Sequence, residues 1–285
     1  MQLHIHARDF ARTSILSLGY NLSERSNPGE LRRLIGQLRP EDCGYELIRI
    51  GAPADGGYLI PNDLNGIEYC FSPGVSTISA FENHLADWNI KSFLADYSIE
   101  CPPIIRPEFV FNKKFLGCGN YGNYITLSAW KEQYLPRYQG DLLLQMDIEG
   151  SEYSVIMNAP DELLEQFRII VVEFHDLHKL FDAVTFRLFA ACFEKLLQYF
   201  HVTHIHPNNI GGSVRSGDIE VPKYLEITFI NNRRVRQTKR RLSFPHPLDA
   251  PNDPAYPRLD LPKCWYCLPP LGAAAGGDPQ LVESC

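Results

Sequence analysis

The fold is decided at residues 142–152, which read LLLQMDIEGSE. Leu142–Met146 is apolar apart from Gln145, and a short apolar run followed by acids and a glycine predicts a buried strand ending at Asp147. Residues 152–158 then show a helical pattern. Because strands that are apolar on both faces are typical of a covered parallel sheet, this stretch predicts one strand–turn–helix unit of such a sheet.

Strands and helices alternate on both sides of this unit. Further strands are expected at 47–50, 58–60, 67–72, 92–95, 109–116, 169–172, 201–206 and 225–230, and helices at 28–38, 78–88, 127–135, 161–166 and 180–200. The last two strands have no helix between them, so one edge of the sheet is expected to be antiparallel. The sequence therefore predicts an α/β, Rossmann-like fold with a mostly parallel sheet and helices on both faces.

The helix at 180–200 is the longest one expected. Its apolar positions recur every three or four residues, a spacing that predicts one buried face. The members of that face are Phe181, Val184, Leu188, Cys192, Leu196 and Phe200.

The chain divides into four parts by composition. We expect an N-terminal helical extension at 1–45, the α/β domain at 46–232, a basic and then proline-rich extended tail at 233–267, and disorder at 268–285. The tail opens with six basic residues and no acid between 233 and 241. The usual explanation of such a run is a solvated surface segment.

Charge and hydropathy exclude several classes of protein. The net charge of −7 gives little general attraction to nucleic acid or anionic lipid. No apolar run approaches the roughly 20 residues that a membrane-spanning helix needs, and residues 1–14 are too polar for a signal peptide. The eight cysteines are dispersed, which indicates reduced thiols and a cytoplasmic protein.

The ends of the first two strands of the α/β domain are the places to look for a cofactor. Ligands bind beyond the carboxyl ends of parallel strands. Gly74 follows one strand and lets the backbone approach a ligand, while Asp96 follows the next and can accept the hydroxyls of a ribose. A plain strand-to-helix turn and a capping aspartate would look the same.

Two later strand ends carry clustered acids and a histidine. Asp147 and Glu149 share a face if their strand continues, and so do Glu173 and His175 after the strand at 169–172. If these strands are neighbours, the four side chains converge in a small volume that suits a general base or a hard divalent cation such as Mg²⁺. Glu152 is interpreted as a helix-capping acid.

A polar segment follows the expected strand at 201–206. His204 and His206 share a face of this strand, and Asn208 follows. The segment either lines an acceptor pocket or forms an ordinary turn at Pro207.

Four stretches of the sequence resemble the FkbM-type family of S-adenosylmethionine-dependent methyltransferases. They are DGGY at 55–58, CFSPGV at 70–75 with AFE at 80–82, QMDIEGSE at 145–152 and EFH at 173–175. The segment FPHPLDAPN at 244–252 also looks like a family feature, so the resemblance runs from about residue 47 to 261. The turn at Gly74 departs from the usual methyltransferase pattern, which has an acid before the first glycine and more glycines.

This resemblance implies a class I methyltransferase fold with a seven-stranded sheet. It implies S-adenosylmethionine as cofactor and a small hydroxyl-bearing acceptor, often a sugar or natural product. The implied cofactor contacts are Tyr58, Ser72, Gly74, Val75, Asp96, Tyr97 and Asp147.

The catalytic hypothesis combines these residues. His175 is expected to be the base, oriented by Glu173 and with Glu149 nearby, while His204, His206 and Asn208 are the candidates for acceptor binding. In a second version, Asp147, Glu173 and His175 hold a divalent ion that binds the hydroxyl.

Three other functions compete with methyl transfer. A nicotinamide-dependent oxidoreductase would share Asp96 but lacks the three-glycine turn. A nucleic-acid-binding or interaction protein would use the basic segment 233–241. A non-catalytic homologue would bind the cofactor and transfer nothing.

Overall fold

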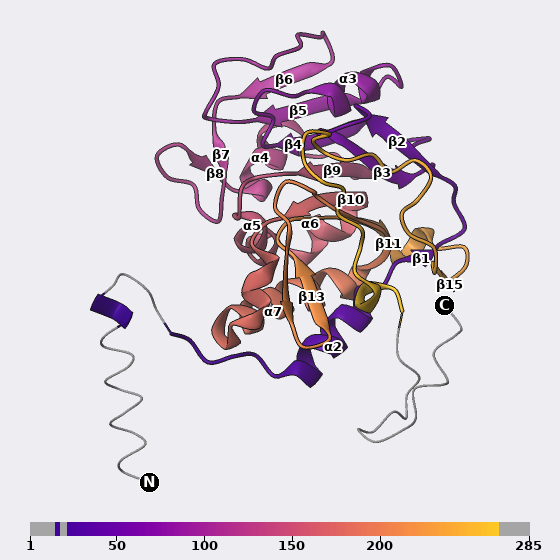
Figure 1. Ribbon diagram of the computed structural model, residues 1–285. Helices are drawn as coiled ribbons and strands as arrows, with labels where there is room; N and C mark the ends of the chain where they lie inside the picture. The colour runs from indigo at the N-terminus through magenta and orange to yellow at the C-terminus, as the bar shows by residue number, and fades with distance from the viewer. Residues whose placement is uncertain (1–14, 18–21, 268–285) are drawn as a thin grey trace.

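A seven-stranded sheet forms the centre of the computed structural model, which describes residues 15–17 and 22–267. The strand order is β11-β14-β10-β9-β4-β5-β6 (Figure 1). The strands are β4 (Tyr69–Pro73), β5 (Lys91–Ala95), β6 (Phe109–Asn112), β9 (Leu142–Met146), β10 (Phe167–Phe174), β11 (Phe200–Pro207) and β14 (Leu225–Asn231). The predicted α/β class and mostly parallel sheet are confirmed.

One strand of the sheet runs against the others. β14 pairs antiparallel with both β10 and β11, whereas β4, β5, β6, β9 and β10 pair in parallel. The expected antiparallel region is therefore present, and its reversed strand lies one place in from the edge. β14 fits there because it returns directly from β11 without a crossover helix, as an antiparallel neighbour can.

The two faces of the sheet are covered by different elements. On β9, Leu142, Leu144 and Met146 point into the larger core, while Leu143 points into the smaller one. The larger core is built with α2 (Pro28–Gln37), α4 (Leu127–Tyr134), α5 (Glu152–Asn158), α6 (Asp161–Gln166) and α7 (Ala183–Tyr199). The smaller core is covered by α3 (Ala80–Ala86) and by the hairpin of β2 (Leu47–Gly51) and β3 (Gly57–Pro61). This alternation explains why β9 reads as continuously apolar.

Short elements complete the described chain. They are β1 (Glu41–Asp42) paired with β15 (Lys239–Arg240), β7 (Phe115–Leu116) paired with β8 (Tyr124–Ile125), β12 (Ser213–Ser216) paired with β13 (Ile219–Pro222), and the 3-10 turns η1 (Leu177–Phe181), η2 (Asn232–Arg234) and η3 (Lys263–Trp265). The β12–β13 hairpin was not expected from the sequence, because its few residues carry no clear alternation of apolar and polar side chains. Among the described residues, no helix is both long and apolar enough to cross a membrane.

The buried face of α7 differs from the predicted one. Val184 and Leu188 are 60% and 63% exposed, and the helix begins at Ala183, where the side chain of Asp182 caps its first turn. The residues that face the core are Phe186, Phe189, Ala190, Cys192, Phe193 and Leu196. The prediction is confirmed for Cys192 and Leu196 and wrong for Val184 and Leu188, because the neighbouring stripe, with three phenylalanines, buries more apolar area.

The segments outside residues 46–232 pack onto the same core. Leu31 and Leu34 of α2 belong to the larger core, and so do Leu261 and Trp265 near the end of the described chain. Residues 268–285, for which disorder was expected, and residues 1–14 and 18–21 lie outside the described part of the chain.

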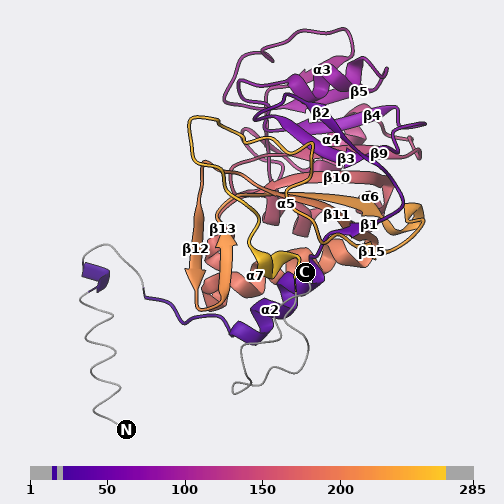
Figure 2. The ribbon, with the colours of Figure 1, turned by 45° about the vertical axis from the view of Figure 1, so that its right-hand side comes forward.

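Residues 244–253, here called the strap, connect the turn between β2 and β3 with β14. Asn252 donates through Nδ2 to Glu226 Oε1 at 2.7 Å, and the backbone N–H of Asp55 donates to the carbonyl of Asn252 at 3.1 Å. In Figures 1 and 2 this segment, drawn in light orange after β15, passes close to the β2–β3 hairpin. The strap thus ties the turn between β2 and β3 to β14.

The aromatic packing of Trp130 gives a test of the larger core. Its side chain is fully buried and meets Phe71 edge-on, with ring centroids 5.0 Å apart. Trp130→Ala should lower the free energy of unfolding by about 3–5 kcal/mol, because it leaves a large cavity. Trp88→Ala, at a side chain that is 46% exposed, should cost about 1 kcal/mol or less. Urea titrations of the two variants measure both values, and equal losses would contradict this account of the core.

Candidate active site

A cleft of about 520 Å³ opens beyond the carboxyl ends of β4, β5 and β9. This is the size of a typical small-ligand site. The residues of the sequence hypothesis that line it are Tyr58, Gly74, Val75, Asp96, Asp147 and Glu149. The cleft lies where the strand-end argument expected it, and the turn between β2 and β3 closes one side through Asp55 and Gly56.

Gly74 holds the β4 turn against the end of β9. Its φ is +88°, and a Cβ built on it would lie 1.5 Å from the carbonyl oxygen of Asp147. No other residue fits there, so Gly74 has a packing reason to be glycine in addition to the predicted close approach to a ligand.

Asp96 braces the same turn from β5. Its Oδ2 accepts from the backbone N–H of Ser76 at 2.8 Å, and its Oδ1 accepts from the N–H and hydroxyl of Ser98 at 2.7 and 2.6 Å. Asp96 lines the cleft, but these contacts occupy three of its roughly four acceptor sites. The bracing role is observed, and the ribose contact stays a prediction.

Two of the expected cofactor residues lie away from the cleft surface. Ser72 is fully buried beneath it, where its hydroxyl contacts Glu82 and Gln145. Tyr97 is 37% exposed and packs against Phe115, with ring centroids 5.4 Å apart. Neither is among the residues that line the cleft.

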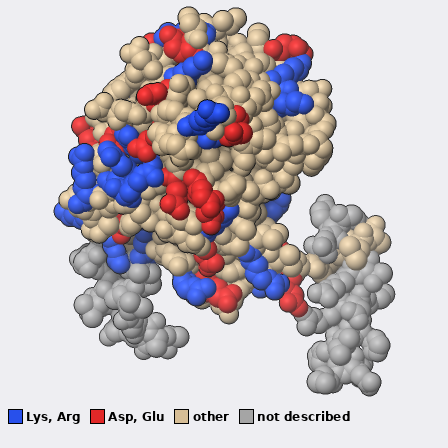
Figure 3. Space-filling model, turned by 180° about the vertical axis from the view of Figure 1, so that it is seen from behind, with Lys and Arg blue, Asp and Glu red and all other residues tan. Residues whose placement is uncertain are grey.

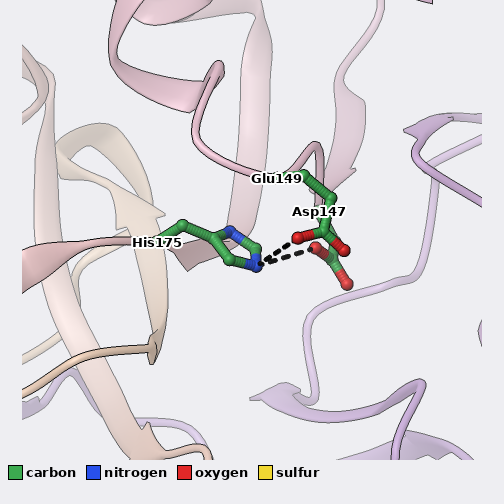
Figure 4. A group of neighbouring side chains, drawn as sticks. All are labelled: Asp147, Glu149 and His175. Atoms are coloured by element: carbon green, nitrogen blue, oxygen red, sulfur yellow. Dashed lines mark ion pairs between the residues drawn. The ribbon is translucent and has the colours of Figure 1, made fainter. Parts of the chain in front are cut away.

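Four carboxylates surround the imidazole of His175. Its Nδ1 hydrogen-bonds Glu152 Oε1 at 3.0 Å, and its Nε2 lies 3.4 Å from Glu149, 3.8 Å from Asp147 and 4.0 Å from Glu173. Figure 4 shows Asp147 and Glu149 both turned toward Nε2. The acids and the histidine that the sequence placed at neighbouring strand ends therefore converge.

The reason for this convergence differs from the predicted one. β9 ends at Met146 and Glu149 has a positive φ of 56°, so the alternation of a continuing strand does not apply. The orienting partner of His175 is Glu152, which also accepts from the N–H groups of Ile148 and Gly150, both at 3.1 Å. These N–H groups precede α5 (Glu152–Asn158), so Glu152 stabilises the turn before the helix and holds the imidazole, and the expected capping of the helix itself is not observed.

The charges in this cluster shift each other's protonation. Burial lowers the pKa of His175, but the hydrogen bond and charge of Glu152, with the charges of Asp147 and Glu149, raise it to about 9. Burial raises the pKa of Asp147 to about 7, which the charge of His175 opposes and that of Glu149 supports. Burial and the charge of Asp147 raise the pKa of Glu173 well above its usual range. The cluster therefore holds protons at neutral pH.

Glu173 and Asn208 form a layer behind the cluster. Asn208 Nδ2 donates to Glu173 Oε1 at 2.8 Å, and both side chains are buried. Neither lines the cleft. Asn208 therefore contacts Glu173 of the His175 cluster and does not itself reach the cleft.

His204 and His206 lie under the strap. His204 Nε2 is 2.8 Å from Asp249 Oδ1 and His206 Nδ1 is 3.6 Å from the same oxygen. The Oδ2 of Asp249 accepts from the N–H of His246 at 2.7 Å. The structure does not bring these two histidines to the cleft, and it places them where they hold the strap on β11.

The family comparison covers the part of the chain that carries the cluster. Residues 125–201 match the family model of the methyltransferase FkbM domain. The match confirms the resemblance to FkbM-type methyltransferases within this segment. The matched segment contains Asp147, Glu149, Glu173 and His175 and ends before β14.

Comparison with other proteins adds little. No curated protein matches the sequence at a significant level. A solved structure with some likeness is that of a fibrillarin/Nop5p complex, which is 13% identical, covers 59% of this chain and 74% of its own, and has a TM-score of 0.35. A likeness this low carries no argument.

Three ligand atoms of the His175 cluster could hold a cation. Oxygens of Asp147 and Glu149 and a ring nitrogen of His175 lie within 4.8 Å of one another in the described structure. Glu173, which the metal hypothesis included, is replaced in this set by Glu149. The same atoms also form a plain ion-paired cluster.

The basic segment 233–241 lies against acids and an aromatic ring. In Figure 3 a broad group of blue side chains lies beside red ones on this side of the molecule. The contacts are Arg233 with Asp141 at 2.6 Å, Arg234 with Asp63 at 2.7 Å, Arg241 with Asp42 at 3.9 Å and Arg236 over the ring of Tyr45 at 4.1 Å. These contacts give four of the six basic residues a structural role and weaken the nucleic-acid hypothesis.

Sequence reasoning missed three residues of the site. Asp55 and Glu82 line the cleft, and Glu152 binds His175. Asp55 and Glu82 were part of the quoted family stretches, but neither follows a central strand, which was the signal used to select site residues.

Glu152 gives the first test of the cluster. Glu152→Gln should lower the pKa of His175 from about 9, because it removes the hydrogen-bonded charge that holds the proton. A two-dimensional NMR titration of the labelled imidazole ring measures this pKa. Glu162→Gln, at an exposed position of α6, should leave it unchanged. An unshifted His175 titration in the Glu152 variant would contradict the assigned pairing.

Proposed function

We propose that this chain is an S-adenosylmethionine-dependent methyltransferase that methylates a hydroxyl oxygen of a sugar-like or natural-product acceptor. The observation that carries the proposal is the His175 cluster at the edge of the cleft, inside the segment that matches an FkbM domain. Free thiols fit the expected cytoplasmic location, and they are found at Cys43, Cys70, Cys101, Cys118, Cys192 and Cys264.

The cleft has features that suit this cofactor. The glycine turn at Gly74 gives close access to backbone, Asp96 stands at the end of β5, and the buried carboxyl of Glu82 has one oxygen without a partner. When bound, S-adenosylmethionine supplies a methyl group on a positively charged sulfur, which is open to in-line displacement. Alignment of the acceptor with this methyl is the main task of the protein.

The acceptor hydroxyl needs a group that takes its proton. Asp147 and Glu149 line the cleft and also face His175 Nε2, so they connect the acceptor to the imidazole. Asp147 Oδ1 is buried and has no hydrogen-bond partner, which leaves it open to a hydroxyl. As the acceptor oxygen displaces the methyl group from the sulfur, its proton passes to Asp147, whose pKa of about 7 leaves part of the carboxylate ionised at neutral pH. His175, whose pKa is raised to about 9, is already protonated there, so its charge orients and stabilises the accepting carboxylate.

The metal version of the mechanism uses the same atoms. A divalent ion on Asp147, Glu149 and His175 would bind the acceptor oxygen and lower the pKa of its hydroxyl. The two versions differ in one respect that is easy to measure, since only the metal version needs an added ion.

Cofactor binding is the first measurement. We expect S-adenosylmethionine to bind with a micromolar Kd by calorimetry, and Asp96→Asn to weaken it at least about tenfold through the loss of charge at the β5 end. Nicotinamide dinucleotides should not bind, because the turn at Gly74 lacks the three glycines. Absence of any binding of the methyl donor, with or without Mg²⁺, would overturn the proposed function.

Turnover tests the role of His175. With an acceptor found by screening sugars and polyhydroxylated metabolites, His175→Gln should keep cofactor affinity within about threefold and lose about 10²–10⁴-fold in kcat. His178→Gln, three residues along the chain, should change neither.

Addition of a chelator separates the two mechanisms. If the cluster acts as a base, EDTA leaves the turnover of the wild-type protein unchanged. If it holds a cation, EDTA abolishes turnover and Mg²⁺ restores it. Normal turnover by His175→Gln would remove His175 from both versions.

A further inference from the structure

Glu82 is a buried carboxyl group on the floor of the cleft. It lies in the first turn of α3, its residue is only 3% exposed, and it is among the residues that line the cleft. Its Oε1 accepts from the hydroxyl of Ser72, whereas its Oε2 is buried with no hydrogen-bond partner. A buried carboxylate oxygen without a donor is costly, so a donor from a ligand would stabilise it.

The neighbours of Glu82 are neutral side chains. Ser72 Oγ lies 2.6 Å from Gln145 Oε1, and Gln145 Nε2 donates to Tyr58 Oη at 3.3 Å. Among the described residues, no lysine, arginine or histidine forms an ion pair with Glu82. Burial therefore raises the pKa of Glu82 to about 7, with the hydrogen bond from Ser72 opposing the shift. The chain itself does not provide the positive charge that this carboxylate lacks.

Glu82 lies close to the Gly74 turn, which is part of the proposed cofactor site. Ser72 comes two residues before Gly74, where the backbone is open to a ligand. The turn itself has no acidic residue before its glycine. Helix α3, which covers the smaller core, supplies a carboxylate instead. Glu82 reaches the Gly74 turn through its hydrogen bond with Ser72.

We propose that Glu82 binds the α-ammonium group of S-adenosylmethionine. This inference rests on the proposed function and adds a cofactor-binding residue to it. The cofactor carries two positive groups, the sulfonium and the α-ammonium. Only the ammonium has N–H donors, and Oε2 of Glu82 needs a donor. A charge-assisted hydrogen bond of this kind satisfies the buried oxygen and favours the ionised carboxylate.

Three ligands separate the groups that Glu82 could recognise. S-adenosylmethionine has both the sulfonium and the ammonium, S-adenosylhomocysteine has only the ammonium, and 5′-methylthioadenosine has neither. Calorimetry of each with the wild-type protein and with Glu82→Gln gives six affinities. We expect the substitution to weaken the first two ligands by about 10- to 100-fold, and to leave 5′-methylthioadenosine within about twofold.

The other outcomes contradict the proposal in distinct ways. Loss of S-adenosylmethionine affinity alone would assign Glu82 to the sulfonium. Equal loss for all three ligands would make its role structural, and no loss for any would remove it from the site. Failure of the wild-type protein to bind any of the three would instead overturn the proposed function.

Two further variants serve as a control and as a second test of the proposal. Glu132→Gln, at an exposed position of α4, should bind all three ligands as the wild type does. Glu82→Met removes the buried polar group completely and avoids leaving an unsatisfied amide. It should show the same ligand pattern as Glu82→Gln, and wild-type affinity for S-adenosylhomocysteine in Glu82→Met would refute the proposal.

Discussion

The contact between Gly74 and the carbonyl oxygen of Asp147 is the constraint on which the rest of the site depends. β4 and β9 are neighbouring parallel strands, so their carboxyl ends meet at one edge of the sheet. The absence of a side chain at Gly74 lets the two ends touch. This closeness places the β4 turn, with Ser72 and Glu82 beneath it, beside the acids that follow β9. The proposed cofactor site and the proposed proton-accepting cluster can then share one cleft.

The sequence predicted the sheet well because its strands carry a strong signal. β9 is apolar at Leu142–Met146 because both faces are covered, and its predicted bounds match those observed. α7 shows the limit of this reasoning. Two overlapping stripes on the helix are apolar, and its spacing alone did not tell that Phe189 and Phe193 face the core while Leu188 faces solvent. That choice depends on the shape of the surface that the helix covers, which is a property of the tertiary structure.

The sequence predicted which residues form the His175 cluster better than it predicted which of them are hydrogen-bonded to each other. His175 was expected beside acids, and the acids are there, but its hydrogen-bond partner is Glu152, which the sequence marked as a cap. One oxygen of Glu152 accepts from the backbone of the turn before α5 and also contacts the imidazole, so a sequence motif gives no sign of the second role. Glu82 was missed for a related reason. It comes from a helix on the covering layer, and strand-end reasoning selects only residues that follow the strands.

The strap has a consequence for the order in which this protein becomes able to bind ligands. Asp55 and Asn252 lie nearly two hundred positions apart in the chain, yet their backbones are hydrogen-bonded, and this contact fixes the turn that forms one wall of the cleft. Contacts of such high sequence separation form late in folding. During synthesis, the strands, the glycine turn and the histidine cluster would all leave the ribosome before the strap does. A nascent chain would therefore hold a folded sheet with an open, incomplete binding site, and the cleft would gain its last wall only after the strap has been synthesised.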